Sequence, residues 1–181
     1  MKKIQKRNII RFSQGCFHQK EDNVAVEHPV TIKINDKEFM TIVCTPEFIE
    51  DMVIGFLASE RVIGKYSEIK EIRVQEELGY VHIKTDKTYP FYENLQSKRY
   101  ITSCCGMSRQ GFVFANDALT AKKMTETRVT LTANECFALM EEMEKSAKLF
   151  QHTGGVHTAS VWDGTCIVLT RMDIRRHTAL Y

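Results

Sequence analysis

The stretch "HPVTIKINDKEFMTIVC", residues 28–44, decides the fold expected for this chain. Apolar and polar residues alternate on both sides of Asn35-Asp36, a pair that favours a tight turn between strands. The alternating positions of the two runs are Val30, Ile32, Ile34, Phe39, Thr41 and Val43. A period of two places one side of each strand on the core, so the stretch predicts a β-hairpin.

The next stretch, "TPEFIEDMVIGFLASERVIG" (residues 45–64), predicts an amphipathic helix. Thr45 is the expected N-cap, Pro46 occupies the first helical position, and the helix ends near Gly64. The apolar residues on one stripe of this helix are Phe48, Ile49, Met52, Val53, Phe56 and Leu57.

Two further strands are predicted over residues 69–74 and 79–85, and residues 86–100 suit an irregular connection. Hairpins mixed with helices predict an α/β protein in which helices cover a mixed sheet. The chain has no repeat and only 3 Pro and 9 Gly, so we expect a single compact domain without a long linker.

The strongest helical pattern lies in residues 131–155. Thr132 and Glu135 form a capping box, and Gly154-Gly155 stop the helix. We expect its methionines to lie in the core. Beyond this helix, Asp163-Gly164 predict a turn, and residues 166–169 predict a buried strand.

Composition excludes several classes of protein. The 181 residues are 43% hydrophobic and 27% charged, as in ordinary globular chains. The net charge is +2 and the basic residues are dispersed, which argues against a nucleic-acid partner. The basic first residues precede no apolar run, and no stretch approaches the length of a membrane span, so we expect a cytoplasmic protein.

The segment "RYITSCCGMSRQGF", residues 99–112, holds two of the six cysteines. No Cys-x-x-Cys pair suggests a zinc site, and adjacent cysteines form only a strained disulfide. Arg109 places a positive charge near Cys104 and Cys105, and neighbouring serines can hydrogen-bond to sulfur, which favours a reactive thiolate. This is the pattern of a reactive-thiol loop.

The other four cysteines, Cys16, Cys44, Cys136 and Cys166, lie in or beside apolar runs and are expected to behave as small buried hydrophobes. Gly154-Gly155 can also open a helix at Val156, with His157 in its first turn, where an anion would be favoured. The alternative to this anion-binding role is a structural one, in which His157 is only hydrogen-bonded locally.

Three stretches of the chain resemble the FdhD family, the formate dehydrogenase accessory sulfurtransferases. The first matches its T-P-x-x-x-E-x-x-x-G-F-L-x-S-E-G-x-I segment through Thr45, Pro46, Asp51, Gly55, Phe56, Leu57, Ser59, Glu60 and Ile63. The second matches T-G-G-x-H-x-A through Thr153, Gly154, Gly155, His157 and Ala159. The third matches D-I-G-R-H-N-A through Asp173, Ile174, Arg176, His177 and Ala179. Order and spacing agree over most of the chain.

The chain also departs from the family pattern. Cys105 aligns with the first cysteine of the family's S-C-G-x-C-G motif, and Ser108 takes the place of the second. Other departures are Arg61, Met172, Arg175 and Thr178. Family members continue beyond the third stretch, so the resemblance implies that a C-terminal part is missing here.

The fold implied by the resemblance is similar to cytidine deaminases, with a β-rich N-terminal extension. The implied organisation is a hairpin–helix–strand region over 1–98, the cysteine loop over 99–112, and the start of a truncated deaminase-like domain over 113–181.

The function implied is a sulfur carrier that takes persulfide sulfur from a cysteine desulfurase and passes it to the molybdenum cofactor of formate dehydrogenase. Cys105 would carry the persulfide, Cys104 would be the alternate thiol, and Arg109 would stabilise the thiolate. Whether such a carrier counts as an enzyme stays open. The residues expected to contact the cofactor, in its guanine dinucleotide form as a transient ligand, are Gly154, Gly155, His157, Arg176 and His177. No tightly bound cofactor or metal is expected. The resemblance also implies a homodimer.

Three alternatives remain beside the carrier. One is a binding module for the cofactor or for formate dehydrogenase without sulfur chemistry, or an inactive fragment. Another is a thiol-redox protein, which adjacency of the cysteines disfavours. A zinc deaminase would need H-x-E and P-C-x-x-C, and His157 is followed by Thr158 and Ala159 instead.

Overall fold

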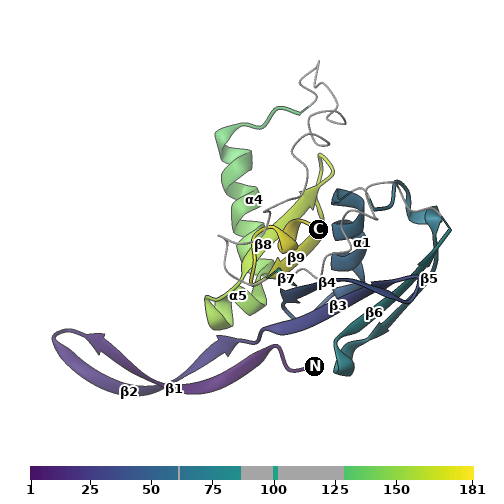
Figure 1. Cartoon of the computed structure of the whole chain (residues 1–181). Coiled ribbons are helices and arrows are strands. Elements are labelled where there is room, and N and C mark those ends of the chain that lie inside the picture. Colours follow the sequence, from purple (N-terminus) through teal and green to yellow (C-terminus); the bar gives the residue numbers. More distant parts are fainter. Residues whose placement is uncertain (61, 87–99, 102–128) are drawn as a thin grey trace.

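The computed structural model describes residues 1–60, 62–86, 100–101 and 129–181 and has a mixed α/β architecture (Figure 1). Its largest sheet has five strands in the order β5-β6-β3-β4-β7. These strands are β3 (His28–Ile34), β4 (Lys37–Cys44), β5 (Ile69–Gln75), β6 (Tyr80–Thr85) and β7 (Tyr100–Ile101). The pairs β3–β4 and β5–β6 are antiparallel, whereas β3–β6 and β4–β7 are parallel, so the predicted mixed sheet is confirmed.

The predicted hairpin over residues 28–44 is confirmed as β3 and β4. Asn35 and Asp36 both have positive φ, 48° and 67°, as a two-residue turn of this kind requires. The predicted inward face of the second strand is wrong beyond Phe39. Ile32 pairs with Met40 and Lys33 pairs with Glu38, so Phe39 is an extra residue in β4.

This β-bulge exchanges the two faces of β4, because one extra residue inverts the alternation. The residues buried in β4 are Phe39, Met40, Ile42 and Cys44, whereas Thr41 and Val43 are only half-buried.

Helix α1 (Ile49–Ser59) packs on this sheet and supplies much of the core. Its buried residues are Ile49, Met52, Val53, Phe56 and Leu57, which confirms the predicted stripe except for the exposed Phe48. The expected N-cap at Thr45 and helical start at Pro46 are wrong. Phe48 is the N-cap, with a left-handed φ of 50°, because the hydroxyl and amide of Thr45 are bound elsewhere.

The end of the described chain lies directly on α1. The short 3-10 helix η3 (Thr178–Leu180) leads to Tyr181, whose ring packs against Phe56 with 5.5 Å between ring centroids. A Cβ added to Gly55 would lie 1.9 Å from the carbonyl oxygen of Tyr181. Only glycine at position 55 allows this close approach. Two further 3-10 helices, η1 (Tyr66–Glu68) and η2 (Glu76–Leu78), flank β5.

The helix predicted over residues 131–155 is two helices, α4 (Ala133–Ser146) and α5 (Lys148–Thr153), which break at Ala147. The capping box of Thr132 and Glu135 is confirmed. The prediction that its methionines belong to the core is wrong: Met140 is exposed and Met143 is half-buried. Helix α4 lies against the hairpin of β8 (His157–Trp162) and β9 (Ile167–Asp173), which covers only part of its apolar surface.

The turn predicted at Asp163-Gly164 is confirmed between β8 and β9. Asp163 accepts hydrogen bonds from the backbone N–H groups of Thr165 and Cys166, at 2.8 and 3.0 Å. The strand predicted as buried is largely exposed at Val168 and Leu169, because β8 and β9 form a separate two-stranded sheet.

An N-terminal hairpin, whose two strands the sequence analysis did not specify within the expected β-rich extension, extends from the body of the molecule (Figure 1). It consists of β1 (Ile4–Ser13) and β2 (Cys16–Ala25), joined at Gln14-Gly15, where both residues have positive φ. We call β1 and β2 together the arm.

Candidate functional site

Two of the three family-like stretches meet at Thr45 and Asp173. The backbone N–H of Thr45 donates to Oδ2 of Asp173 at 2.8 Å. In return, the hydroxyl oxygen of Thr45 accepts a hydrogen bond from the N–H of Ile174 at 3.0 Å. This pair of bonds fixes the end of β9 against the end of β4, although 128 residues separate the two positions in sequence.

Asp173 is a buried carboxyl group with several hydrogen-bond donors around it. Its Oδ1 accepts the backbone N–H of Arg175 at 2.9 Å, and the side chain of Thr178 also hydrogen-bonds to it. Burial raises the pKa of Asp173 above its usual value, and this effect exceeds the lowering by the bonds from Arg175, Thr45 and Thr178 and by the charge of Arg175. The group therefore anchors the third family-like stretch to the sheet.

Cys44, the residue before Thr45, is a packed thiol. It is 1% exposed, and its Sγ lies 3.7 Å from the backbone oxygen of His28, which accepts its hydrogen bond. Burial, and to a smaller extent the charge of Asp173, raises the pKa of Cys44 far above the usual thiol range. A thiol held neutral is a poor nucleophile, so the predicted structural role of Cys44 is confirmed.

The other described cysteines differ from that prediction. Cys16, Cys136 and Cys166 are exposed free thiols, not buried ones. Cys16 lies beside the turn of the arm, and Cys136 lies on the first turns of α4, so neither apolar neighbourhood became part of a core.

Gly154 and Gly155 end a helix and do not begin one. Gly154 has φ 60° and is the C-cap of α5, where glycine is favoured because the left-handed conformation carries no Cβ strain. Val156 precedes strand β8, and His157 is the first residue of that strand. The predicted anion site at a helix N-terminus is therefore wrong. His157 is exposed and pairs with Asp173 across the β8–β9 ladder.

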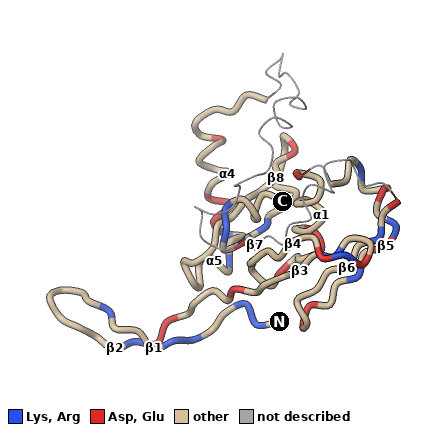
Figure 2. Tube along the Cα trace, in the orientation of Figure 1, with Lys and Arg blue, Asp and Glu red and all other residues tan. Residues whose placement is uncertain are grey.

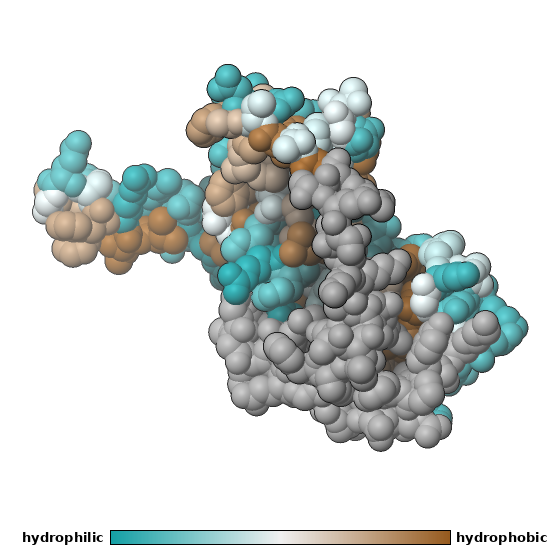
Figure 3. Space-filling model, turned by 90° about the horizontal axis from the view of Figure 1, so that it is seen from above, coloured by the Kyte–Doolittle hydropathy of each residue, from teal (hydrophilic) through white to brown (hydrophobic). Residues whose placement is uncertain are grey.

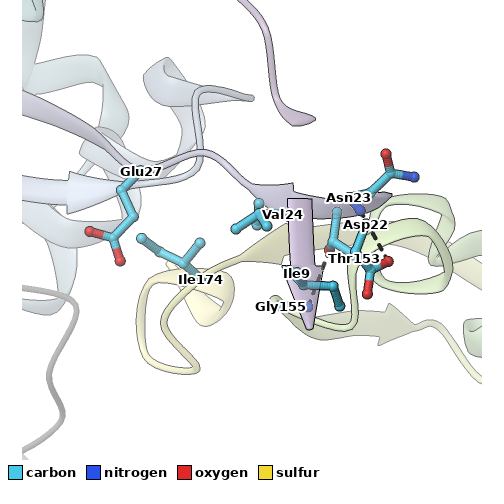
Figure 4. Close-up of a pocket in the computed structure, with 9 residues that line it drawn as sticks. Ile9, Asp22, Asn23, Val24, Glu27, Thr153, Gly155 and Ile174 are labelled. Atoms are coloured by element: carbon cyan, nitrogen blue, oxygen red, sulfur yellow. Dashed lines mark hydrogen bonds between the residues drawn. The ribbon is translucent and has the colours of Figure 1, made fainter. Parts of the chain in front are cut away.

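A cleft of about 510 Å³ lies between the base of the arm and the last two family-like stretches (Figure 4). Its lining residues are Ile9, Asp22, Asn23, Val24, Ala25, Glu27, Thr153, Gly155 and Ile174. Asp22 and Glu27 lie toward opposite ends of the row drawn in Figure 4, and aliphatic side chains lie between them. Among the cofactor residues expected from the sequence, Gly155 lines this cleft.

The polar groups of the cleft are mostly acceptors. The hydroxyl of Thr153 accepts the N–H of Gly155 at 3.1 Å and donates to the carbonyl of Leu149 at 2.8 Å. The N–H of Gly155 is thereby engaged, and the charged lining residues are carboxylates. This lining suits a ligand edge rich in N–H donors better than a phosphate.

Gly154, His157, Arg176 and His177 are not among the lining residues of that cleft. Arg176 is exposed and His177 is half-buried, both in the turn that follows Asp173. The predicted residues therefore lie near one another in the fold, but they do not line one common cavity.

Cys104, Cys105 and Arg109, the predicted sulfur-carrying residues, lie outside the described residues. The described chain comes nearest to them in sequence at strand β7, which ends at Ile101, three residues before Cys104. Strand β7 pairs in parallel with β4, and Ile101 is the partner of Ile42. Strand β4, which lies beside β7, ends at Cys44, two residues after Ile42, and the Thr45 anchor is the next residue.

Sequence reasoning missed two features of this region. The Thr45–Asp173 link and the contact of Gly55 with Tyr181 join positions that only the tertiary fold brings together. The sequence did carry one signal for these two features, because Thr45, Gly55 and Asp173 all match the family pattern. Within the described ranges, no group of three or more His, Cys, Asp or Glu side chains is arranged to hold a metal ion. In that same part of the chain, no helix is long and apolar enough to cross a membrane.

The fold and its buried anchor define a mixed α/β protein in which the first and third family-like stretches are joined at the end of β4, and the second is paired with the third through the β8–β9 ladder. A protein-family model described as FdhD/NarQ matches residues 25–180. The chain belongs to the FdhD/NarQ family, as the resemblance predicted.

Curated relatives agree with this assignment. The chain is 48% identical over 175 residues to the sulfur carrier protein FdhD of Shouchella clausii, a match that covers 96% of this chain and 66% of the relative. It is 40% identical over 177 residues to the protein of the same name from Listeria innocua, covering 98% of this chain and 68% of the relative. The chain thus spans about two thirds of the length of these relatives.

A solved structure shares the fold. The crystal structure of a protein from Desulfotalea psychrophila, provisionally described as a formate dehydrogenase accessory protein, superposes with a TM-score of 0.73. The match covers 99% of this chain and 66% of the other, at 19% identity.

Proposed function

We propose that this chain acts as a sulfur carrier that helps to activate formate dehydrogenase. The observation that carries the proposal is its 48% identity, over 96% of its length, to a relative named as a sulfur carrier protein. The anchoring of the family-like stretches to one another supports it, because these stretches form a connected structure around Thr45 and Asp173.

The proposed chemistry begins at Cys105. Its thiolate attacks the terminal sulfur of a persulfide on a cysteine desulfurase, the S–S bond of the donor breaks, and the donor cysteine leaves as a thiolate. Cys105 then holds the sulfur as its own persulfide, with no net oxidation. Release of that sulfur as sulfide to the metal requires two electrons, which a small-molecule thiol supplies by closing a mixed disulfide with Cys105, because a disulfide to the adjacent Cys104 would be strained. The cation of Arg109 favours the attacking thiolate.

The molybdenum cofactor in its guanine dinucleotide form is the proposed recipient. The cleft at the base of the arm is suited to the guanine end, because the N–H groups of guanine match the carboxylate of Glu27. Asp22 lies toward the other end of the cleft (Figure 4) and is paired with Lys20 at 3.7 Å. This placement keeps Gly155 as a contact residue and leaves Gly154, His157, Arg176 and His177 as candidates for the rest of the ligand.

Formate dehydrogenase and a cysteine desulfurase are the proposed protein partners, and the cytoplasm is the proposed location. We also propose that the fold is related to that of the cytidine deaminases, since a mixed sheet covered by helices is common to both descriptions.

Mass spectrometry after incubation with a cysteine desulfurase and free cysteine tests the proposal. We expect a gain of one sulfur atom on the intact chain and on the Cys104→Ala variant, and no gain on Cys105→Ala. Cys16→Ala is the matched control, because Cys16 is an exposed thiol far from the cysteine segment in sequence. No gain on the wild-type chain would contradict the carrier function.

A binding module without sulfur transfer is the second candidate, and Ser108 in place of the family's second motif cysteine favours it. Such a module would bind the guanine dinucleotide cofactor or formate dehydrogenase and would remain unmodified in the same experiment.

A further inference from the structure

The tip of the arm carries an apolar surface that the described part of the chain leaves uncovered. Ile10, Phe12 and Phe17 are 70%, 63% and 76% exposed. Phe12 and Phe17 are cross-strand partners with 5.0 Å between their ring centroids, and Ile10 lies two residues from Phe12 on the same face. We call these three residues the arm tip. Figure 3 shows hydrophobic side chains gathered along the arm.

The opposite face of the arm is basic at the same level. Arg11 pairs with His18, and Lys20 pairs with Ile9 further from the turn. These positions alternate with those of the arm tip, so their side chains point to the other side of the hairpin. Lys20 is already paired with Asp22 at 3.7 Å, so Arg11 is the cation of this face that a test should change.

The arm also concentrates the positive charge of the chain. Residues 1–25 contain six Lys or Arg and two Asp or Glu, which gives a net charge of +4, whereas the whole chain carries only +2. Figure 2 shows Lys and Arg along both strands of the arm. An anionic surface therefore attracts the arm more strongly than it attracts the rest of the molecule.

The arm is held at its base and projects from the body of the molecule. Lys3 forms an ion pair with Glu47, and the N–H of Val26 donates to the carbonyl of Lys3 at 3.0 Å. Each strand has ten residues, which gives a length of about 33 Å. The hairpin extends away from α4, where Glu141 and Glu144 are exposed (Figure 1). A flat surface can therefore reach the tip without meeting this acidic helix.

We propose that the arm is a membrane contact. The arm tip inserts among the acyl chains at the surface of an anionic bilayer, and Arg11 and Lys20, on the face turned away from the acyl chains, reach the phosphate groups of the lipids. An element that is apolar on one face and basic on the other lies in the plane of a bilayer surface in this way, because long basic side chains extend to the headgroups.

The placement of the charges on the far face favours lipid over other partners. A protein partner is contacted through one mixed face, in which polar groups surround the apolar ones. Single-stranded nucleic acid likewise requires basic and aromatic side chains that lie together along one groove. In the arm, Arg11 and the two phenylalanines lie on opposite faces, so a bilayer surface satisfies both at once.

The backbone limits how deeply the arm inserts. The arm is a sheet of only two strands, so each strand has an outer edge that the sheet leaves unpaired. Unpaired N–H and C=O groups need water and are not tolerated in the hydrocarbon of a bilayer. The arm should therefore rest at the level of the headgroups, with only the side chains of the arm tip among the acyl chains.

Co-sedimentation of the full chain with lipid vesicles tests the contact. We expect binding to vesicles made of phosphatidylglycerol and phosphatidylcholine, weaker binding to phosphatidylcholine alone, and loss of most binding in high salt, because salt screens the attraction. Phe12→Ser with Phe17→Ser should lower the partition coefficient at least about tenfold, since two buried aromatic side chains are lost. Arg11→Gln should lower it about fivefold, the effect expected of one cation at an anionic surface.

Two matched controls lie on the body of the molecule. Tyr66 is an aromatic residue of η1 that is 65% exposed, and Arg73 is an exposed cation of β5. Tyr66→Ser and Arg73→Gln should leave the partition coefficient unchanged. All of these variants should keep the wild-type melting temperature, because the replaced side chains are exposed.

Fluorescence quenching locates the contact. Trp162 in β8 is the only tryptophan of the chain, so Phe12→Trp adds one reporter at the arm tip. With vesicles whose acyl chains carry bromine near the headgroups, Phe12→Trp should be quenched and its emission should shift to shorter wavelength, whereas the wild type should show neither change. Bromine near the centre of the bilayer should quench Phe12→Trp less, because the arm lies at the surface.

Each contrary result overturns the proposal. A chain that does not bind the anionic vesicles, or a double serine variant that binds them as the wild type does, excludes the arm tip as a membrane contact. Equal quenching of the wild type and Phe12→Trp would mean that another surface faces the lipid. If the vesicles are ignored and the double serine variant instead changes the sedimentation of the free chain, the arm is a contact between protein chains.

Discussion

The backbone amide of Thr45 and the carboxylate of Asp173, 2.8 Å apart, join the end of the core hairpin to the C-terminal hairpin of the chain. The carboxylate uses both oxygens, because Oδ1 accepts the N–H of Arg175. Asp173→Asn replaces one acceptor oxygen with an NH₂ group and leaves one of these buried N–H groups without a partner.

We expect Asp173→Asn to lower the free energy of unfolding by about 1–3 kcal/mol at neutral pH, the usual range for an unsatisfied buried donor. Urea unfolding followed by circular dichroism measures the loss. Asp86→Asn is the control, since Asp86 is exposed and only its pair with Lys70 is affected. Equal stability of the two variants would show that the Asp173 link is not structural.

The pH dependence of the same residue has a defined sign. Burial raises the pKa of Asp173 in the folded chain above the ordinary 3.8, so the folded state binds the proton more tightly than the unfolded state. The stabilisation from this proton is fully present below pH 3.8 and is lost as the pH rises through the folded pKa.

The stability of the wild type relative to Asp173→Asn should therefore decrease from about pH 3.5 to neutral pH, because asparagine does not titrate. Urea titrations of both proteins across that range give the difference directly. A difference that increases with pH would mean that the folded pKa is lowered and that hydrogen bonding, not burial, dominates.

Gly55 is expected to tolerate no side chain. The carbonyl of Tyr181 occupies the space of its Cβ, and a backbone atom on the packed terminal segment has little freedom to move. We expect Gly55→Ala to lower the free energy of unfolding by about 1–3 kcal/mol, as overpacking does. Amide exchange over residues 174–181 should become faster. Ala58→Ser, an exposed change on the same helix, should alter neither quantity.

The sequence predicted those elements whose signals are local. Asn35-Asp36 and the flanking alternation specify β3 and β4, and Thr132 with Glu135 specifies the start of α4, because neighbours in sequence make these contacts. The bulge at Phe39 could not be predicted in this way. One extra residue inverts the buried face of β4, and the alternation of apolar and polar residues carries no separate mark of it.

Periodicity also could not say which apolar faces would be covered. The stripe of α4 has the spacing of a core helix, yet Phe137 is exposed, because spacing reports a face and not its partner. The end of β9 shows the same limit for the site. Asp173 matched a family pattern, but its role depends on Thr45, which only the tertiary fold brings near.

Removal of the α4 cap should loosen that helix without unfolding the core. Thr132 accepts the N–H of Glu135 at 3.3 Å, and the carboxylate of Glu135 accepts the N–H of Thr132 at 2.8 Å. Thr132→Ala should cost about 1 kcal/mol of helix stability, seen as faster amide exchange in α4. Glu135→Gln retains the reciprocal bonds of a capping box and should cost less.

The cap should also weaken in acid. Hydrogen bonds from the side chain and backbone of Thr132 lower the pKa of Glu135, so this stabilisation is present above pH 4.5 and is lost as the pH falls through the folded pKa. In Thr132→Ala the protection factors of the α4 amides, which are exchange rates corrected for the intrinsic effect of pH, should depend less on pH across that window. An unchanged dependence would show that the capping box does not form in solution.

The cleft at the base of the arm should distinguish guanine from adenine nucleotides. A carboxylate accepts both N–H donors on the Watson–Crick edge of guanine, whereas the same edge of adenine presents one donor group beside an acceptor. We expect calorimetry to show tighter binding of GDP than of ADP. Glu27→Gln should weaken GDP binding about tenfold, since a charge-assisted hydrogen bond is worth about 1.5–3 kcal/mol. Asp86→Asn, outside the cleft, should leave GDP binding unchanged.

Two results would show that the cleft is not the guanine site: equal affinity for the two nucleotides, or a Glu27→Gln variant that binds GDP as the wild type does. Persulfide formation on Cys105 is measured independently, so the carrier function would not be decided by either result.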